Sequence, residues 1–140
     1  MPRSPFTAED IYSFRWIDHV RVSPEGDRVA YVVRRADREA VDYRSHVHVR
    51  GVREDDLVIQ ATAGKQDDSP EWAPDGRRLA YTGKKGNAHQ VFVLDPDAGD
   101  ARQVTSLEFG ARAPKWSPDG RRVAFRGSVV GHPEGVVADP

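Results

Sequence analysis

The stretch that decides the fold is residues 114–125, P-K-W-S-P-D-G-R-R-V-A-F, because it occurs more than once in the chain. Residues 70–81 read P-E-W-A-P-D-G-R-R-L-A-Y and match it at eight of twelve positions. A weaker copy, V-R-V-S-P-E-G-D-R-V-A-Y, covers residues 20–31. The central prolines Pro24, Pro74 and Pro118 are 50 and 44 residues apart. Spacing of this kind is typical of repeat architectures such as propellers.

Each copy predicts a tight hairpin between two strands. In S-P-D-G, proline presets the first corner of a type I turn, aspartate suits the next position, and glycine accepts a positive φ. The strand before the turn carries Trp72 or Trp116, which is large enough to fill a layer between two sheets. If Trp116 is buried there, its replacement by alanine should cost ~3–5 kcal/mol. The strand after the turn alternates large residues with Ala30, Ala80 and Ala124, which allow close packing on one side.

Two further strands follow each of the first two hairpins. They are expected at residues 46–50 and 57–61 in the first unit, and at 90–94 and 101–105 in the second. About four strands per 40–50 residues is the spacing of propeller blades. Thr7 is a good N-cap for one short helix, with Glu9 and Asp10 in its first turn. The sequence therefore predicts an all-β fold, a partial β-propeller of about two and a half four-stranded blades with one short N-terminal helix.

The expected division is residues 1–18 as helix and lead-in, 19–127 as an incomplete propeller, and 128–140 as an irregular tail. The blade units are expected at 19–65, 66–108 and 109–127. A closed propeller needs 4–8 blades, so an open stack exposes a sheet face and invites association. Either further polypeptide continues the propeller, or several copies complete one another.

Composition excludes several classes of protein. Lys plus Arg is 21 and Asp plus Glu is 22, so a nucleic-acid binder with a basic face is not expected. The absence of cysteine excludes disulfides, cysteine-ligated zinc and a cysteine nucleophile. No run approaches the ~18 apolar residues of a membrane span. The first residues lack the apolar core of a signal peptide, so a cytoplasmic location is expected.

Each residue that suggests chemistry also has a structural interpretation, and the structural one is favoured. His46 and His48 point to one side of a strand, yet no third metal ligand is evident nearby. The serines of the turns can bond the local backbone and have no matched base. The paired carboxylates and the paired cations fit solvated loops or structural roles better than calcium or phosphate sites. These candidates are Ser23, Ser117, Ser128, Asp55, Asp56, Asp67, Asp68, Arg77, Arg78, Arg121, Arg122, Lys84, Lys85 and the acidic loop 95–100. Three further histidines, His19, His89 and His132, show no partner pattern and stay unassigned. No catalytic, cofactor-binding or metal-binding residue is predicted, and no cofactor.

The turn units and the residues around them resemble a known family. The units S-P-E-G, A-P-D-G and S-P-D-G, each followed by R-V-A-Y, R-L-A-Y or R-V-A-F, resemble the propeller repeats of prolyl oligopeptidase-family serine peptidases and of the Tol-system propeller protein. The stretches T-A-E-D-I-Y at 7–12, R-W-I at 15–17, V-V-R-R-A-D at 32–37 and Y-R-S-H-V-H-V at 43–49 resemble acylaminoacyl-peptidase and dipeptidyl-aminopeptidase-like members. The resemblance covers residues 7 to about 127.

This resemblance implies a propeller that precedes an α/β-hydrolase domain and restricts its access to short or unfolded peptides. The family's serine lies in a G-x-S-x-G elbow, which this sequence lacks; residues 127–131, G-S-V-V-G, have the wrong spacing. The chain alone is therefore expected to be inactive. Its expected partners are the remainder of the propeller and the hydrolase domain, or further copies of itself. The alternative is a non-enzymatic module that binds protein or peptide, like the Tol-system propeller.

Overall fold

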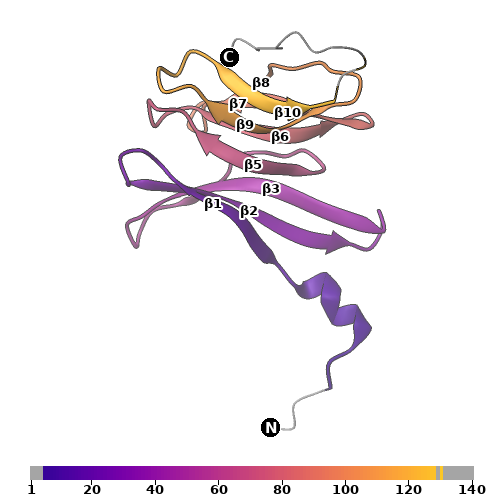
Figure 1. Ribbon diagram of the computed structural model, residues 1–140. Coiled ribbons are helices and arrows are strands. Elements are labelled where there is room, and N and C mark those ends of the chain that lie inside the picture. Colours follow the sequence, from indigo (N-terminus) through magenta and orange to yellow (C-terminus); the bar gives the residue numbers. More distant parts are fainter. Residues whose placement is uncertain (1–4, 129, 131–140) are drawn as a thin grey trace.

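Residues 5–128 and 130, which the computed structural model describes, form ten strands in three antiparallel sheets (Figure 1). The first sheet contains β1 (Trp16–Val22), β2 (Arg28–Asp37), β3 (Asp42–Gly51) and β4 (Val58–Gln60). The second contains β5 (Asp67–Trp72), β6 (Leu79–Lys85), β7 (Ala88–Leu94) and β8 (Ala101–Gln103). The third contains β9 (Ala111–Trp116) and β10 (Val123–Gly127). This arrangement of four, four and two strands confirms the predicted partial propeller.

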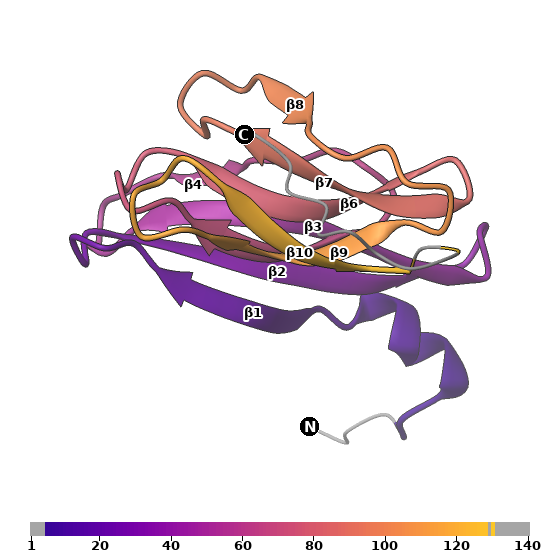
Figure 2. The same cartoon turned by 45° about the horizontal axis from the view of Figure 1, so that its top comes forward.

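The sheets stack face to face, with the second between the other two (Figures 1 and 2). Their first strands meet, because β1 contacts β5 and β5 contacts β9. The core has two layers, one on each side of the second sheet, and side chains that alternate along β6 contribute to both. Leu79 and Tyr81 face the first sheet, while Ala80 faces the third. The first layer is formed by Ala30, Val32, Val47, Val49, Trp72, Leu79, Tyr81 and Leu94, and the second by Ala80, Val91, Val93, Ala111 and Val123.

The three predicted turns form as the sequence indicates. The turn glycines Gly26, Gly76 and Gly120 have φ values of 76°, 67° and 68°. Each of their N–H groups donates to the carbonyl three residues earlier at 2.9 Å. Since an L side chain is strained at such φ values, glycine is the residue that closes each hairpin without cost.

A β-bulge interrupts the first strand of every sheet, which the sequence analysis did not predict. The residues at the bulges are His19, Ser69 and Ala113, with φ values of 50°, 52° and 53°. Their spacing of 50 and 44 residues equals that of the turn prolines. A bulge bends its strand and increases the local twist, so all three sheets share the same distortion at the edge where they meet.

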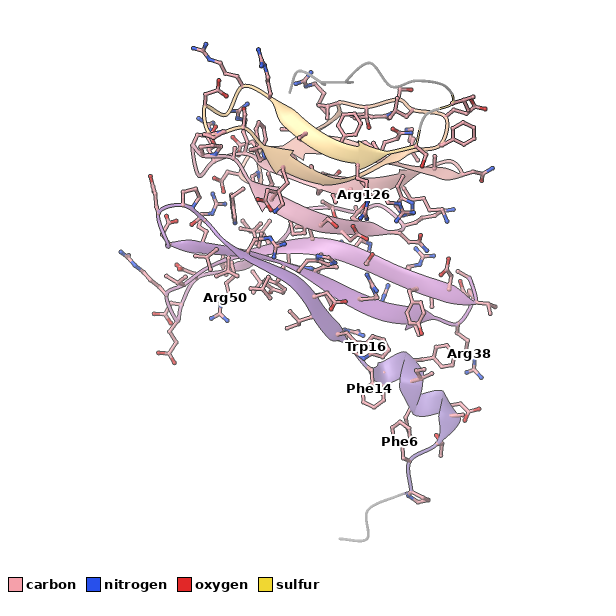
Figure 3. All side chains as sticks on the ribbon, in the orientation of Figure 1. Phe6, Phe14, Trp16, Arg38, Arg50 and Arg126 are labelled. Carbon is pink, nitrogen blue, oxygen red and sulfur yellow. The ribbon has the colours of Figure 1, made fainter. Side chains whose placement is uncertain are left out.

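The predicted N-terminal helix is present as a 3₁₀ helix, η1 (Ala8–Ser13), with no buried residue. Thr7 begins it, and its N–H donates to the Asp10 carboxylate at 2.7 Å. Aromatic rings connect the helix to the first sheet, because Phe14 lies between Phe6 and Trp16 (Figure 3). No helix among the described residues has the length and apolar character that crossing a membrane requires.

Candidate functional site

Charged side chains connect the three first strands at equivalent positions of the repeat. Glu71 on β5 lies between Arg21 on β1 and Lys115 on β9, and each of the three precedes its turn proline by three residues. The Glu71 Oε2 atom is 3.3 Å from Arg21 Nε and 2.7 Å from Lys115 Nζ. The sequence analysis missed this row, although the common offset from the prolines was the signal that could have found it.

The tryptophans of the repeat connect the same strands through the backbone. The Trp72 indole N–H donates to the carbonyl of Arg21 at 3.1 Å, and that of Trp116 donates to the carbonyl of Glu71 at 3.1 Å. Trp72 is 7% exposed, whereas Trp116 is half-buried beside the second core layer. The interpretation of both as core residues agrees with this placement.

An arginine of the preceding sheet covers each tryptophan ring. The guanidinium carbon of Arg28 lies 5.3 Å from the Trp72 ring centroid, and that of Arg78 lies 4.7 Å from the Trp116 centroid. Arg78 also donates to the carbonyl of Gly120 at 3.1 Å. Cation–π contacts of this kind add to the packing between sheets. Arg28 and Arg78, each two residues after a turn glycine, therefore join neighbouring sheets.

A polar cavity of about 250 Å³ lies near the beginning of β5 and β9. It is lined mainly by charged and polar side chains, namely Arg34, Asp42, Tyr43, Ser45, Gln66, Asp68, His89 and Arg112. Nδ1 of His89 accepts a hydrogen bond from Arg112 at 2.6 Å. Burial and the neighbouring Arg112 cation lower the pKa of His89, which favours the neutral ring that can accept this bond.

Asp67 is the most deeply buried carboxylate candidate, with 2% exposure. Its carboxylate accepts the Gly64 N–H at 2.8 Å. Burial raises the pKa of Asp67, although hydrogen bonds from Thr62 and Gly64 oppose this. The group fixes the connection between the first and second sheets, so its role is structural.

The sequence analysis also missed a second repeated feature, a threonine in the connection that follows each of the first two sheets. Thr62 and Thr105, which are 43 residues apart, accept the N–H of Val47 at 3.0 Å and of Val91 at 2.8 Å. The glutamine two residues before each threonine donates to the threonine carbonyl, Gln60 at 2.9 Å and Gln103 at 2.6 Å. The common Q-x-T pattern at 60–62 and 103–105 was the sequence signal.

The structure does not bring the histidine candidates together as a site. His46 Nε2 donates to the Gly64 carbonyl at 2.9 Å, and His48 stacks on Tyr31 with the ring centroids 5.7 Å apart. Within the described part of the chain, no group of three or more His, Asp or Glu side chains is placed to hold a metal ion. His132 lies outside the described residues.

The serine hydroxyls of the turns bond their own loops. Ser23 accepts the Arg28 N–H at 3.0 Å, and Ser117 accepts the Arg122 N–H at 2.9 Å. Both hydroxyls also donate to carboxylates, Ser23 to Asp27 at 2.7 Å and Ser117 to Asp119 at 2.5 Å. Among the residues that the structure describes, no histidine is paired with either hydroxyl to act as its base.

Among the remaining charged candidates, Asp55, Asp56 and the acidic loop 95–100 lie between strands, whereas Asp68 lies in β5 and Lys84 and Lys85 lie in β6. Asp55 and Asp56 line an open pocket beside the end of the first sheet, and Asp56 accepts the Arg53 N–H at 2.8 Å. In the acidic loop, Asp95 pairs with Arg77 at 2.7 Å and accepts the backbone N–H of Asp97 at 3.0 Å.

Comparison with known proteins places this architecture among peptidase and Tol-type propellers. No family model matches the chain. The "Uncharacterized peptidase YuxL" of Bacillus subtilis is 31% identical over 105 residues, which are 74% of this chain and 16% of that protein. The "Tol-Pal system protein TolB" of Hahella chejuensis is 42% identical over 40 residues, which are 29% of this chain and 9% of that protein.

Solved structures agree with the fold. The acylaminoacyl peptidase of Pyrococcus horikoshii superposes with a TM-score of 0.68 at 23% identity, over 89% of this chain and 19% of that one. The β-propeller domain of the Trilobed protease from Pyrococcus furiosus gives 0.64 at 18% identity, over 81% of this chain and 34% of that one. The chain thus spans less than a fifth of the length of YuxL and of the acylaminoacyl peptidase. It is a β-propeller segment that resembles those of peptidases of the prolyl oligopeptidase family.

Proposed function

We propose that this chain forms part of a propeller that limits which substrates reach the hydrolase domain of a larger, cytoplasmic serine peptidase. The observation that carries the proposal is the similarity to a peptidase over 105 residues, which are 74% of this chain. The function would belong to the whole protein, and this segment would contribute part of the wall around the access route.

The physical basis is the way the first strands are held together. Glu71 forms ion pairs in both directions, and the indole of Trp116 donates to the Glu71 carbonyl. Fixed contacts at the edge where the sheets meet keep that edge narrow. A narrow, rigid opening excludes folded proteins while it admits short or extended peptides.

Chemistry on the chain itself is not part of the proposal. The hydroxyls of Ser23 and Ser117 are engaged in their own turns, and the sequence contains no G-x-S-x-G elbow. Nucleophilic attack requires a serine held beside a base and oxyanion donors. We therefore assign the reaction to a hydrolase domain and access control to the propeller.

The test compares substrates of different size in the whole protein that contains this segment. Glu71→Arg places a cation between Arg21 and Lys115, so both ion pairs are lost and the three first strands repel one another. Hydrolysis of a short chromogenic peptide should be unchanged. Hydrolysis of an unfolded protein such as casein should rise by about fivefold, which corresponds to ~1 kcal/mol.

The matched control is Glu108→Arg, which makes the same charge change at an exposed position in the connection before β9. This variant should leave both rates unchanged. An equal effect of Glu71→Arg on the short and the long substrate would contradict access control. Absence of peptidase activity in the whole protein, together with no labelling by a fluorophosphonate, would contradict the peptidase assignment.

A second candidate function is a propeller that binds a protein or peptide without hydrolysing it. The similarity to TolB over 40 residues favours this candidate. The same fluorophosphonate experiment separates the two, because only a serine peptidase forms the covalent adduct. An unlabelled whole protein that retains a partner through the open edge of the first strands would support the binding module.

A further inference from the structure

Four charged side chains share one cavity without neutralising one another. The polar cavity of about 250 Å³ is lined by Arg34 of β2, Asp42 of β3, Asp68 of β5 and Arg112 of β9. Among the residues that the structure describes, no ion pair joins either of these arginines to either of these aspartates. Both signs of charge are therefore available to a ligand that enters the cavity.

The cavity lies where strands of all three sheets come together. It is found where β2 ends and where β3, β5, β7 and β9 begin. In Figure 1 this is the end of the stack at which η1 leads into β1. Groups carried on strands are held more precisely than groups on loops, so the four charges have fixed positions relative to one another.

The two arginines retain hydrogen-bond donors for an anion. In the described part of the chain, the Arg112 guanidinium forms one hydrogen bond, to His89 Nδ1 at 2.6 Å. Arg34 has one ion pair there, a long contact of 3.9 Å between its Nη1 and Oδ2 of Asp18. Arg126 lies opposite Arg112 in the pairing of β9 with β10, where like charges repel and a bound anion relieves the repulsion. A guanidinium group presents five N–H donors in a planar fork that fits a carboxylate.

The aspartates and a serine of the cavity retain capacity of the complementary kind. Asp68 Oδ1 accepts the Ser69 hydroxyl at 2.7 Å. Asp42 Oδ2 accepts the Gln66 side-chain amide at 2.7 Å. An ionised carboxylate has about four lone-pair sites, so both aspartates have room for further donors. Ser45 lines the cavity with 4% exposure, and its hydroxyl forms no hydrogen bond with any described residue. An ammonium group, with three N–H donors, satisfies acceptors of this kind.

We propose that this cavity binds a small zwitterion, namely a free α-amino acid or a short peptide with unblocked termini. The carboxylate of the ligand lies against the guanidinium groups of Arg34 and Arg112. Its ammonium group donates to the carboxylates of Asp42 and Asp68. The cavity is smaller than the range of about 300–1,000 Å³ that is typical of sites for drug-sized ligands, which suits a ligand of this size. The inference does not depend on the proposed function, because all four charged groups belong to this chain.

The test is a titration of the full chain followed by nitrogen–proton correlation NMR. The probes are alanine and alanyl-alanine, and the matched compounds that lack one charge each are N-acetylalanine and alanine amide. Both zwitterions should shift the amide signals of Ser45, Asp68 and Arg112, and either order of their affinities identifies the length that fits. N-acetylalanine and alanine amide should each bind at least about tenfold more weakly, because each leaves one pair of charged groups without a partner.

Two variants assign the two ends of the ligand. Arg112→Gln should lower the affinity for alanine by about tenfold and abolish the preference over alanine amide. Asp68→Asn should abolish the preference over N-acetylalanine. Arg121→Gln and Asp100→Asn make the same changes at exposed residues outside the cavity and should leave binding unchanged. The spectrum of each variant also reports its fold, and Arg34→Gln takes the place of Arg112→Gln if the latter variant does not fold.

Binding of N-acetylalanine or of alanine amide with the affinity of alanine would overturn the proposal, since the cavity would then recognise a single charge. Absence of a saturable shift with either zwitterion at about 10 mM would overturn it as well. Unchanged binding of alanine by folded Arg112→Gln and Asp68→Asn variants would place the site elsewhere and refute the assignment to this cavity.

Discussion

Replacement of Trp72 by alanine should destabilise the fold more than the same change at Trp116. Trp72 is 7% exposed within the first core layer, and removal of a buried tryptophan side chain costs ~3–5 kcal/mol. Trp72→Ala also removes the indole hydrogen bond to the Arg21 carbonyl and the cation–π contact with Arg28. We expect a decrease of about 4 kcal/mol in the free energy of unfolding for Trp72→Ala.

Trp116 has the same two contacts but is half-buried, because it borders the open third sheet. We expect about 2–3 kcal/mol for Trp116→Ala, which is less than the sequence alone suggests, since part of the ring is already in water. The two phenylalanine variants serve as controls, because they keep an aromatic ring and remove only the indole N–H. Each should cost less than its alanine counterpart.

The measurement is urea unfolding followed by far-UV circular dichroism, with linear extrapolation to water. Circular dichroism is preferred to fluorescence because each variant removes one of three tryptophans. The reasoning fails if Trp116→Ala costs as much as Trp72→Ala. It also fails if both changes cost less than ~1 kcal/mol, because the tryptophans would then not hold the sheets together.

Three further changes test other contacts. Glu71→Gln removes the charge between Arg21 and Lys115 and should cost roughly 0.5–1 kcal/mol in urea unfolding, with a smaller effect in 1 M NaCl. Ala113→Gly removes a side chain from a residue with φ of 53° and should be neutral or stabilise by up to about 1 kcal/mol, measured as a shift in Tm. Burial raises the pKa of Asp67 in the folded state, so ionisation of this carboxyl destabilises the fold. As the pH falls through the raised pKa, Asp67 is protonated, and the free energy of unfolding of the native chain should rise relative to that of Asp67→Asn.

Each of these changes has a matched control in the same chain. Glu108→Gln removes one charge from an exposed position outside the row and should leave stability unchanged within about 0.5 kcal/mol. Ala124 lies in β10 and is not among the residues with positive φ, so Ala124→Gly should destabilise by ~0.5–1 kcal/mol. The control carboxylate is Asp95, whose pKa is lowered by its hydrogen bond from Arg77, so the native chain should lose stability relative to Asp95→Asn on acidification. A fall in the stability of the native chain relative to Asp67→Asn on acidification would contradict the sign given above.

The strands and turns were predictable because the information for them is local. Proline, aspartate and glycine in consecutive positions specify each turn, and the alternation after it specifies the strand. The helix was less predictable in form, because the segment is a 3₁₀ helix without a buried residue, and Ile11 within it is 39% exposed. So short a segment gains little from packing and adopts the tighter helix.

The contacts between sheets were not predictable from composition or alternation. Arg21 and Glu71 are 50 residues apart, and each looks like an ordinary surface charge when its own strand is considered alone. Their pairing depends on which edge of each sheet meets its neighbour, which is a property of the stacked fold. The bulges at Ser69 and Ala113 were hidden for a different reason, because residues with positive φ are seldom serine or alanine.

The indole bonds between sheets have a consequence for how such repeats can diverge. Trp72 and Trp116 donate to main-chain carbonyls, which are present whatever residue occupies the accepting position. Substitution at that position therefore leaves the carbonyl that accepts the indole hydrogen bond in place. The side chain at the accepting position can therefore differ in charge between units without loss of the indole hydrogen bond. It does so from Arg21 to Glu71 to Lys115. The hydrogen bonds to the backbone therefore help to hold neighbouring sheets together. The alternating charges of Arg21, Glu71 and Lys115 favour one order of the units along the stack.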